Sequence, residues 1–289
     1  MTRKSFIPTL ASMTEKDFDK FSRFIHSNLG IKMPPQKKSM LEARLRKRLR
    51  ALGMSSFEEY REYFFSDEGM PKEIVSLCDV VTTNKTDFFR EPAHFDFLTR
   101  AALPDMIQRG LISEQTPLKL WSAGCSSGEE PYTLSMVLSE YASQVPNFDF
   151  SILGTDLSSR VLERAVNGIY SMERILPVVE SLRRKYLLRS KNRDEQLVRV
   201  IPELRARMRF MRLNFMDEDY GLDEKFQVIF CRNVIIYFDR PTQASIVGKI
   251  CMQLKTDGYI FMGHSETLNG MGLPLKQVAP SVYQRLPGY

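Results

Sequence analysis

The segment 120–132, Leu-Trp-Ser-Ala-Gly-Cys-Ser-Ser-Gly-Glu-Glu-Pro-Tyr, joins a short apolar run to a helical pattern through a loop that contains Gly124 and Gly128. Glycine has no Cβ, so such a loop lets the backbone come close to a nucleotide-like ligand. Glu129 and Glu130 stand where a phosphate-binding loop would place no acids. The loop therefore favours a ligand with hydroxyls and positive charge, such as an adenosyl group on a sulfonium that also carries an amino acid.

The same loop also permits a different chemistry. Gly124-Cys125-Ser126-Ser127-Gly128 matches G-x-S-x-G, the nucleophile elbow of α/β-hydrolases, and Asp156 and His264 follow in the hydrolase order. Three fixed positions in five residues arise often by chance, and this reading leaves the two adjacent acids unexplained. A hydrolase with Ser126 as nucleophile is the remote alternative.

Three further strand ends carry polar residues. In an open α/β sheet, ligands bind outside the carboxyl ends of the strands. Asp156 follows one apolar run and could accept hydrogen bonds from both ribose hydroxyls, while Asn214 and Phe215 follow another and could meet the edge and the face of an adenine. The segment 230–238, Phe-Cys-Arg-Asn-Val-Ile-Ile-Tyr-Phe, ends a third run. Together these ends predict one ligand site along one edge of a sheet.

From residue 118 onward, apolar runs alternate with helical patterns, which is typical of a mainly parallel sheet. The expected strands are 118–123, 148–155, 208–213, 226–231 and 257–262, and the expected helices are 129–143, 158–168 and 242–254. Apolar residues at 187–188 and 197–201 flank a polar turn, which predicts an inserted hairpin. The segment 281–286 is expected to close the sheet as an edge strand.

Residues 14–80 have the pattern of a small helical domain. Thr14 and Gly30 are placed to cap the ends of one helix, Gly53 to end a second helix over 36–52, and Ser56-x-x-Glu59 to open a third as a capping box.

The second helix carries most of the net charge of the chain. Eight basic residues and one acid lie between Lys32 and Arg50, whereas the whole chain has a formal net charge of +6. Leucines at 41, 45, 49 and 52 form one stripe, and the basic residues that we expect to face outward are Arg44, Arg46, Lys47, Arg48 and Arg50. Such a face suits an acidic protein segment, and it also suits nucleic-acid phosphates.

Composition narrows the class of protein. No apolar run in the 289 residues approaches the roughly 20 needed to span a bilayer, and the N-terminus lacks the apolar core of a signal peptide. The four cysteines form no C-x-x-C pair, and the three histidines are scattered. We expect a cytoplasmic protein with no disulfides, no metal and no direct membrane insertion.

Four ordered motifs resemble the CheR family of chemotaxis receptor methyltransferases: Thr82–Glu91, Gly128–Tyr132, Cys231–Phe238 and Gly263–Glu266. The resemblance implies an all-α domain (1–80) that docks the receptor and a linker (81–95) that contributes to the cofactor site. A class I S-adenosylmethionine (SAM)-dependent methyltransferase domain, α/β and Rossmann-like, would follow (96–289). Its mainly parallel sheet would have an antiparallel edge, with a β-subdomain inserted at about 186–207.

The resemblance also implies roles for individual residues in SAM binding. Asn84, Thr86 and Arg90 would close over SAM, with Arg90 paired to its carboxylate. The remaining cofactor contacts would come from Gly124, from Glu130 near the amino group, from Asp156 on the ribose, and from Asn214 and Phe215 around the adenine.

The implied reaction transfers the methyl group of SAM to glutamate carboxylates of methyl-accepting chemotaxis receptors, giving methyl esters and S-adenosylhomocysteine in sensory adaptation. Arg232 and Asn233 would lie beside the methyl group, and Tyr237 would orient the acceptor. Tyr237, Arg232 and Arg90 are the expected catalytic residues. A glutamate with a pKa near 4.3 is ionised at pH 7, so no general base is needed.

The expected partner is the cytoplasmic helical domain of chemotaxis receptors. We expect the chain to be a monomer that is recruited to membrane receptor arrays. The hairpin loop 189–196 lacks the glycines of family members that hold a receptor pentapeptide, so we do not expect a pentapeptide tether. A SAM-dependent nucleic-acid methyltransferase that uses the basic helix remains the main alternative. It would be expected to carry a [D/N]-P-P-[Y/F] motif, where this chain has Asn-Val-Ile-Ile at 233–236, so no nucleic-acid partner is expected.

Overall fold

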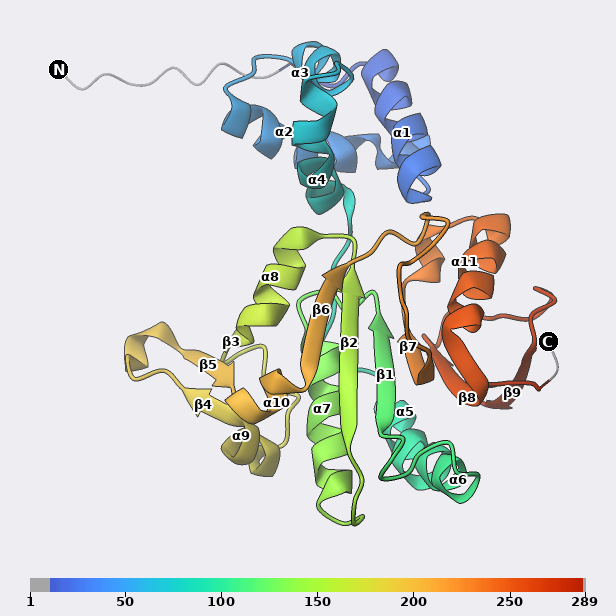
Figure 1. The fold of residues 1–289 in the computed structure, drawn as a ribbon. Coiled ribbons are helices and arrows are strands. Elements are labelled where there is room, and N and C mark those ends of the chain that lie inside the picture. Colours follow the sequence, from blue (N-terminus) through green and yellow to red (C-terminus); the bar gives the residue numbers. More distant parts are fainter. Residues whose placement is uncertain (1–10, 288–289) are drawn as a thin grey trace. The chain divides into compact units, whose positions relative to one another are not determined.

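The computed structural model describes residues 11–287, which fall into two compact units, 11–83 and 84–287 (Figure 1). The N-terminal segment in which no signal peptide is expected lies outside the described residues. Within 11–287, no helix combines the length and the apolar character that crossing a membrane would require.

The first unit is helical, as predicted, and its helix ends follow from local sequence. It contains α1 (Glu15–Leu29), η1 (Pro35–Lys37), α2 (Lys38–Leu52), α3 (Phe57–Phe64) and α4 (Gly69–Val81). Thr14 and Asp17 form a capping box on α1, and left-handed glycines end α1 and α2. Ser56 caps α3, but the Glu59 carboxylate accepts hydrogen bonds from Ser55 instead of returning to Ser56, so half of the predicted box forms.

Within residues 84–287, the main sheet has seven strands in the order β6-β2-β1-β7-β8-β10-β9. The five predicted strands are present and mutually parallel: β1 (Leu118–Ala123), β2 (Phe150–Asp156), β6 (Met208–Arg212), β7 (Phe226–Cys231) and β8 (Leu254–Met262). Their carboxyl ends therefore lie at one edge of the sheet.

The predicted last strand is present, but its expected place at the edge is wrong. β10 (Val282–Arg285) pairs antiparallel with β8 on one side and with β9 (Leu275–Ala279) on the other, so β9 is the edge strand. β9 gave no signal in the sequence because it is short and mostly exposed, and prolines at 274 and 280 bracket it.

Helices on this sheet complete the core. The unit opens with α5 (Ala93–Phe97), the π-helical turn η2 (Leu98–Ala102) and α6 (Leu103–Gln108); α7 (Glu129–Ala142) and α8 (Ser159–Asn167) contact β2, and α11 (Arg240–Gln253) contacts β8. Buried Leu120, Ile152, Val228, Phe230 and Phe261 join the strands to α5, α6 and α7 in one cluster. This packing holds the strand ends, and the loops that follow them, in place.

Beside α7 the described residues form a small antiparallel sheet of three strands, in the order β3-β5-β4. β4 (Leu187–Arg189) and β5 (Leu197–Val200) are the predicted hairpin, whereas β3 (Ile169–Ser171) was not predicted. Short helices α9 (Glu180–Tyr186), η3 (Arg193–Glu195) and α10 (Pro202–Ala206) complete this region. It shares a core with α7, in which Tyr170 and Val198 pack with Tyr132 and Met136.

Candidate functional site

The glycine loop follows β1, and the space around its glycines admits no side chain. Gly124 and Gly128 have φ of +81° and +96°, which only glycine adopts easily. A Cβ on Gly124 would lie 2.4 Å from Val234 Cγ2, and one on Gly128 would lie 2.8 Å from the hydroxyl of Tyr170. The loop is therefore packed against the turn after β7 and against β3.

Asp156, at the end of β2, organises the rim of the sheet. Its two carboxylate oxygens accept hydrogen bonds from the backbone amides of Ser126 and Ser158, each at 2.9 Å. Its carbonyl accepts from Leu213 N at 3.0 Å, which places Asn214 next to the same strand end. Asp156 thus presents a carboxylate beside the glycine loop, and a carboxylate oxygen can accept more than one hydrogen bond.

The hydrolase alternative gains no support from these contacts. The hydroxyl of Ser126 donates to the main-chain oxygen of Asn84 at 3.0 Å, so its proton points to the backbone. The His264 ring instead packs against His94, with ring centroids 5.2 Å apart.

Glu130 and Arg232 form a buried ion pair, with 2.7 Å between Glu130 Oε2 and Arg232 Nε. Their side chains are 10% and 2% exposed. Glu130 also accepts from Ser122 Oγ at 2.6 Å, and Arg232 donates to the Arg90 carbonyl at 2.7 Å. A pair this deeply buried is stable only when such additional hydrogen bonds satisfy both partners.

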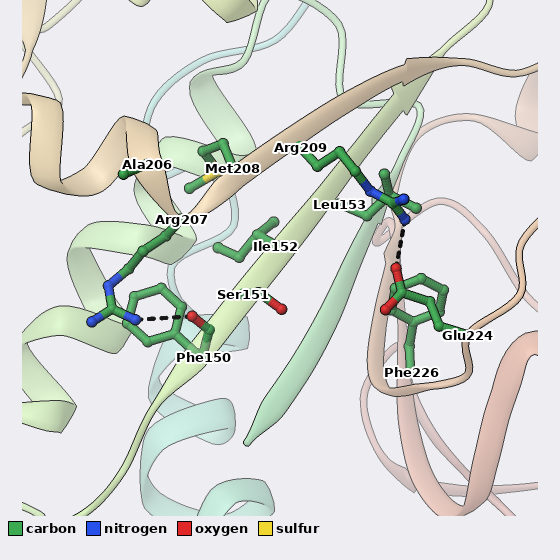
Figure 2. Close-up of a pocket in the computed structure, with 10 residues that line it drawn as sticks. All are labelled: Phe150, Ser151, Ile152, Leu153, Ala206, Arg207, Met208, Arg209, Glu224 and Phe226. Carbon is green, nitrogen blue, oxygen red and sulfur yellow. Dashed lines mark hydrogen bonds and ion pairs between the residues drawn. The ribbon is translucent and has the colours of Figure 1, made fainter. Parts of the chain in front are cut away.

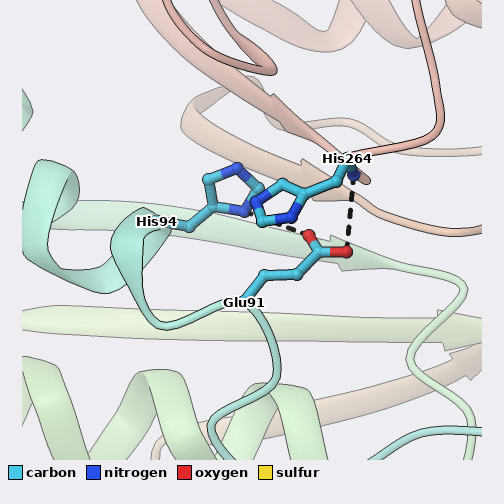
Figure 3. Close-up of side chains that lie close together, drawn as sticks. All are labelled: Glu91, His94 and His264. Carbon is cyan, nitrogen blue, oxygen red and sulfur yellow. Dashed lines mark hydrogen bonds and ion pairs between the residues drawn. The ribbon is translucent and has the colours of Figure 1, made fainter.

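Glu91, His94 and His264 form a cluster whose donor atoms lie within 4.8 Å of one another (Figure 3). Arg232 Nη1 lies 3.2 Å from His94 Nδ1 and 3.6 Å from Glu91 Oε2. Burial and this neighbouring cation lower the pKa of His94 to about 4. The guanidinium thus competes with a metal ion for the same donors, and we propose no metal here. The cluster could not be predicted from the sequence because His264 lies 170 residues beyond the Glu91–His94 pair.

Glu266 fixes the turn that follows β7. Its carboxylate accepts from the backbone amides of Gly263, Asn233 and Ile235 at 2.7–2.8 Å. Asn233 has a left-handed φ of +59°, and η4 (Ile235–Tyr237) follows directly. Burial raises the pKa of Glu266, while the three amides favour its ionised form. The motif Gly263–Glu266 was recognised in the sequence, but this function of its acid was not.

The predicted residues of the 84–91 segment lie at the same rim. Asn84 contacts Ser126 through its carbonyl, and the Thr86 carbonyl accepts from Arg174 at 3.0 Å. The half-buried Arg90 side chain donates to the Lys85 carbonyl at 3.3 Å.

Beyond Asp156, the predicted adenine residues are folded into their own loop. Asn214 Oδ1 accepts from Met216 N at 3.1 Å, and Phe215 is 9% exposed with its ring packed against Tyr220.

The five predicted docking residues of α2 divide into two groups. Arg44 donates to main-chain carbonyls of Val81 and Thr82, Arg46 pairs with Glu42, and Arg48 donates to Glu73 at 2.7 Å. These three are half-buried: Arg44 and Arg48 join α2 to α4, and Arg46 pairs within α2. Lys47 and Arg50 are exposed.

Comparisons with known proteins agree with this arrangement. A family model described as CheR methyltransferase, SAM binding domain, matches residues 84–283, and one described as CheR methyltransferase, all-alpha domain, matches 16–82. The chemotaxis protein methyltransferase of Borreliella burgdorferi is 38% identical over 95% of both chains. That of Escherichia coli is 34% identical over 89% of this chain and 86% of its own.

Among solved structures, the glycopeptide N-methyltransferase MtfA complexed with sinefungin is 12% identical, with a TM-score of 0.33 over 66% of this chain and 59% of that chain. A likeness of this extent carries no further argument.

Proposed function

The chain belongs to the CheR methyltransferase family, and from that premise we propose that it transfers the methyl group of SAM to glutamate carboxylates of methyl-accepting chemotaxis receptors. The observation that carries the proposal is the convergence of the glycine loop, Asp156, the Glu130–Arg232 pair and the 84–91 segment at one edge of the sheet.

Asp156 would hold the ribose of SAM because its carboxylate lies beside the glycine loop, and a carboxylate oxygen can accept more than one hydrogen bond. Glu130 would lie near the methionyl amino group and at the same time neutralise Arg232. A neutralised Arg232 is compatible with a sulfonium nearby, whereas an unpaired guanidinium would repel it. Arg90, on the adjoining segment, would pair with the methionyl carboxylate.

Asn84, Thr86 and Gly124 would line the cofactor site, and Asn214 and Phe215 would lie around the adenine. Phe215 would then contact the adenine mainly through the part of its ring that Tyr220 leaves uncovered. SAM supplies the electrophilic methyl group, and these residues of the chain hold and orient it.

The acceptor glutamate is already ionised at pH 7, so the chain must align the carboxylate with the methyl group and need not remove a proton. Tyr237 lies in the turn that Glu266 holds, and its phenol would orient one oxygen of the acceptor without the tight pairing of an arginine. Asn233, in the same turn, and Arg232 would lie beside the transferring methyl group.

The exposed Lys47 and Arg50 would steer and dock the acidic helical region of the receptor. Arg44 and Arg48 would contribute mainly by joining α2 to α4, and Arg46 by its pair with Glu42 within α2. We propose that docking brings a cytoplasmic monomer to membrane receptor arrays without insertion into the bilayer and without a pentapeptide tether.

The proposed reaction is tested by transfer of labelled methyl groups from SAM to receptor-containing membranes, followed by mild alkali. Methyl esters release volatile methanol, whereas N-methyl groups are stable to base. Volatile label is expected. Base-stable label would contradict the proposal and favour the nucleic-acid or amine methyltransferase.

Variants then separate the proposed catalytic site from the proposed docking surface on α2. Tyr237→Phe is expected to lower turnover while SAM affinity is kept, and full activity would remove its assigned role. Lys47→Glu/Arg50→Glu is expected to raise KM for the receptor at least 10-fold at low salt. Arg100→Glu, on an 82% exposed side chain of the other unit, is the matched control and should have little effect.

A further inference from the structure

The small three-stranded sheet touches both segments that we assign to the cofactor site. Tyr170, on β3, donates from its hydroxyl to the carbonyl of Ser127 in the glycine loop at 2.7 Å. Its ring packs edge-on against Phe88 of the 84–91 segment, with centroids 4.9 Å apart. Tyr170 is 5% exposed, so this contact is part of the core.

Arg174, just after β3, makes a second set of contacts to the same two segments. Its guanidinium donates to the Thr86 carbonyl at 3.0 Å and lies 3.3 Å from the Asp87 carboxylate. It also pairs with Glu129 at 2.5 Å. One side chain thereby joins the 84–91 segment to the N-terminus of α7.

Loss of the contact between Arg174 and Glu129 should cost free energy, because Glu129 is buried. It is 1% exposed, and its second oxygen accepts from Ser127 Oγ at 2.7 Å. Among the ion pairs of the described residues, Arg174 is the cation that contacts the Glu129 carboxylate. A buried carboxylate without a cation rearranges or takes up a proton. Ser127 bonds the Glu129 carboxylate and would move with it. Ser127 follows Ser126, whose backbone amide donates to Asp156.

We propose that Arg174, supported by Tyr170, is a positioning residue for SAM that sets the 84–91 segment against the glycine loop. The small sheet is then a structural part of the cofactor site in addition to any role in binding a partner. This inference rests on the proposed function for the identity of the ligand. Arg174 lies outside the turn of Tyr237, so its loss should weaken SAM binding more than it slows methyl transfer.

The test measures SAM affinity by calorimetry, and KM for SAM and kcat separately, in Arg174→Met, Arg174→Lys and Arg184→Met. Arg174→Met is expected to weaken SAM binding by about 10- to 100-fold, as expected for loss of charge-assisted hydrogen bonds, while kcat at saturating SAM stays within about threefold. Arg174→Lys should recover part of the affinity, because lysine keeps the charge but not the planar fork that reaches Thr86 and Glu129 together.

Arg184→Met is the matched control. Arg184 lies on α9 of the same small region, is 79% exposed and pairs with Glu180. Wild-type affinity is expected in this variant. Unchanged SAM affinity in Arg174→Met would overturn the inference.

A second variant covers the case in which Arg174→Met does not fold. Glu129→Gln/Arg174→Met removes both charges and should restore the melting temperature without restoring SAM affinity. Recovery of both would show a purely structural role and overturn the proposal. Failure of the wild-type protein to bind SAM would instead contradict the proposed function itself, so the two failures are distinguishable.

Discussion

The two ends of the parallel sheet carry arginine–carboxylate pairs in opposite environments. At the amino ends of the strands lies a cavity of about 360 Å³, where Arg209 lies 2.5 Å from Glu224 (Figure 2). Arg207, which also lines this cavity, pairs with Asp149. The side chains of Arg209 and Glu224 are 60% and 28% exposed. At the carboxyl ends, beyond β1 and β7, those of Arg232 and Glu130 are 2% and 10% exposed.

The comparison shows that a surface cavity need not coincide with the place where charged side chains are buried. Exposed pairs contribute about 0–1 kcal/mol because water competes with them. Breaking a buried pair by removing one partner costs about 3–5 kcal/mol, since the remaining charge stays uncompensated. The proposed SAM site lies at the end where the arginine–carboxylate pair is buried, and the predictions below test that contrast.

The largest effect is expected for Arg232→Met. It should lower the free energy of unfolding by about 3–5 kcal/mol, because Glu130 is left buried without its cation. Urea denaturation measures the change. Glu130→Gln/Arg232→Met should recover part of the loss, and a single variant as stable as the wild type would remove the contrast between the two ends.

The second prediction concerns the pH dependence caused by His94. The unfolded chain takes up a proton at this histidine near pH 6.5, whereas the folded protein does so only near pH 4. Stability should therefore fall as the pH drops from about 6.5 towards 4, by about 2–3 kcal/mol from this group. His94→Gln should flatten that part of the curve of unfolding free energy against pH. The same slope of unfolding free energy against pH in both proteins would contradict the assignment of this pH dependence to His94.

Glu266→Gln should have a somewhat smaller effect. Three backbone amides donate to the carboxylate, and the amide group of glutamine turns an N–H towards one of them. A loss of about 1–3 kcal/mol is expected, together with lower turnover because the turn with Tyr237 loosens. Thermal melts and kcat at saturating SAM measure the two effects. Glu68→Gln, on an exposed pair in the helical unit, serves as the control.

The smallest effect is expected at the amino ends of the parallel strands. A double-mutant cycle on Arg209→Met and Glu224→Gln should give a coupling energy below about 1 kcal/mol and leave SAM affinity unchanged. A coupling of several kcal/mol, or weakened SAM binding, would make the two ends alike and undo the comparison.

Features that depend on neighbouring residues were predictable. The helix caps at Thr14, Gly30 and Gly53 form as expected, because they use side chains and φ values available within one turn. The five parallel strands were also predictable, since each is an apolar run long enough to be buried. The alignment of their carboxyl ends along one edge then followed from the mainly parallel sheet.

Contacts between distant residues required the tertiary structure. The Glu130–Arg232 pair joins residues 102 positions apart, and the Glu129–Arg174 pair joins residues 45 apart. No local pattern identifies such partners, because they meet only when the sheet and the helices are packed. Strands β3 and β9 were missed for a related reason: they are short or polar, and pairing with neighbours makes them strands.

Helix α2 shows both kinds of information in one element. Its leucine stripe and its excess of basic residues follow from the order of residues alone, because helical periodicity assigns each one to a face. Which of those basic residues face solvent was decided by the helices packed around them. Nearby carboxylates and carbonyls accept hydrogen bonds from Arg44, Arg46 and Arg48, whereas Lys47 and Arg50 are exposed. The position of these acceptors is set by folding, because a guanidinium bonds the acceptors that the packed chain brings close to it.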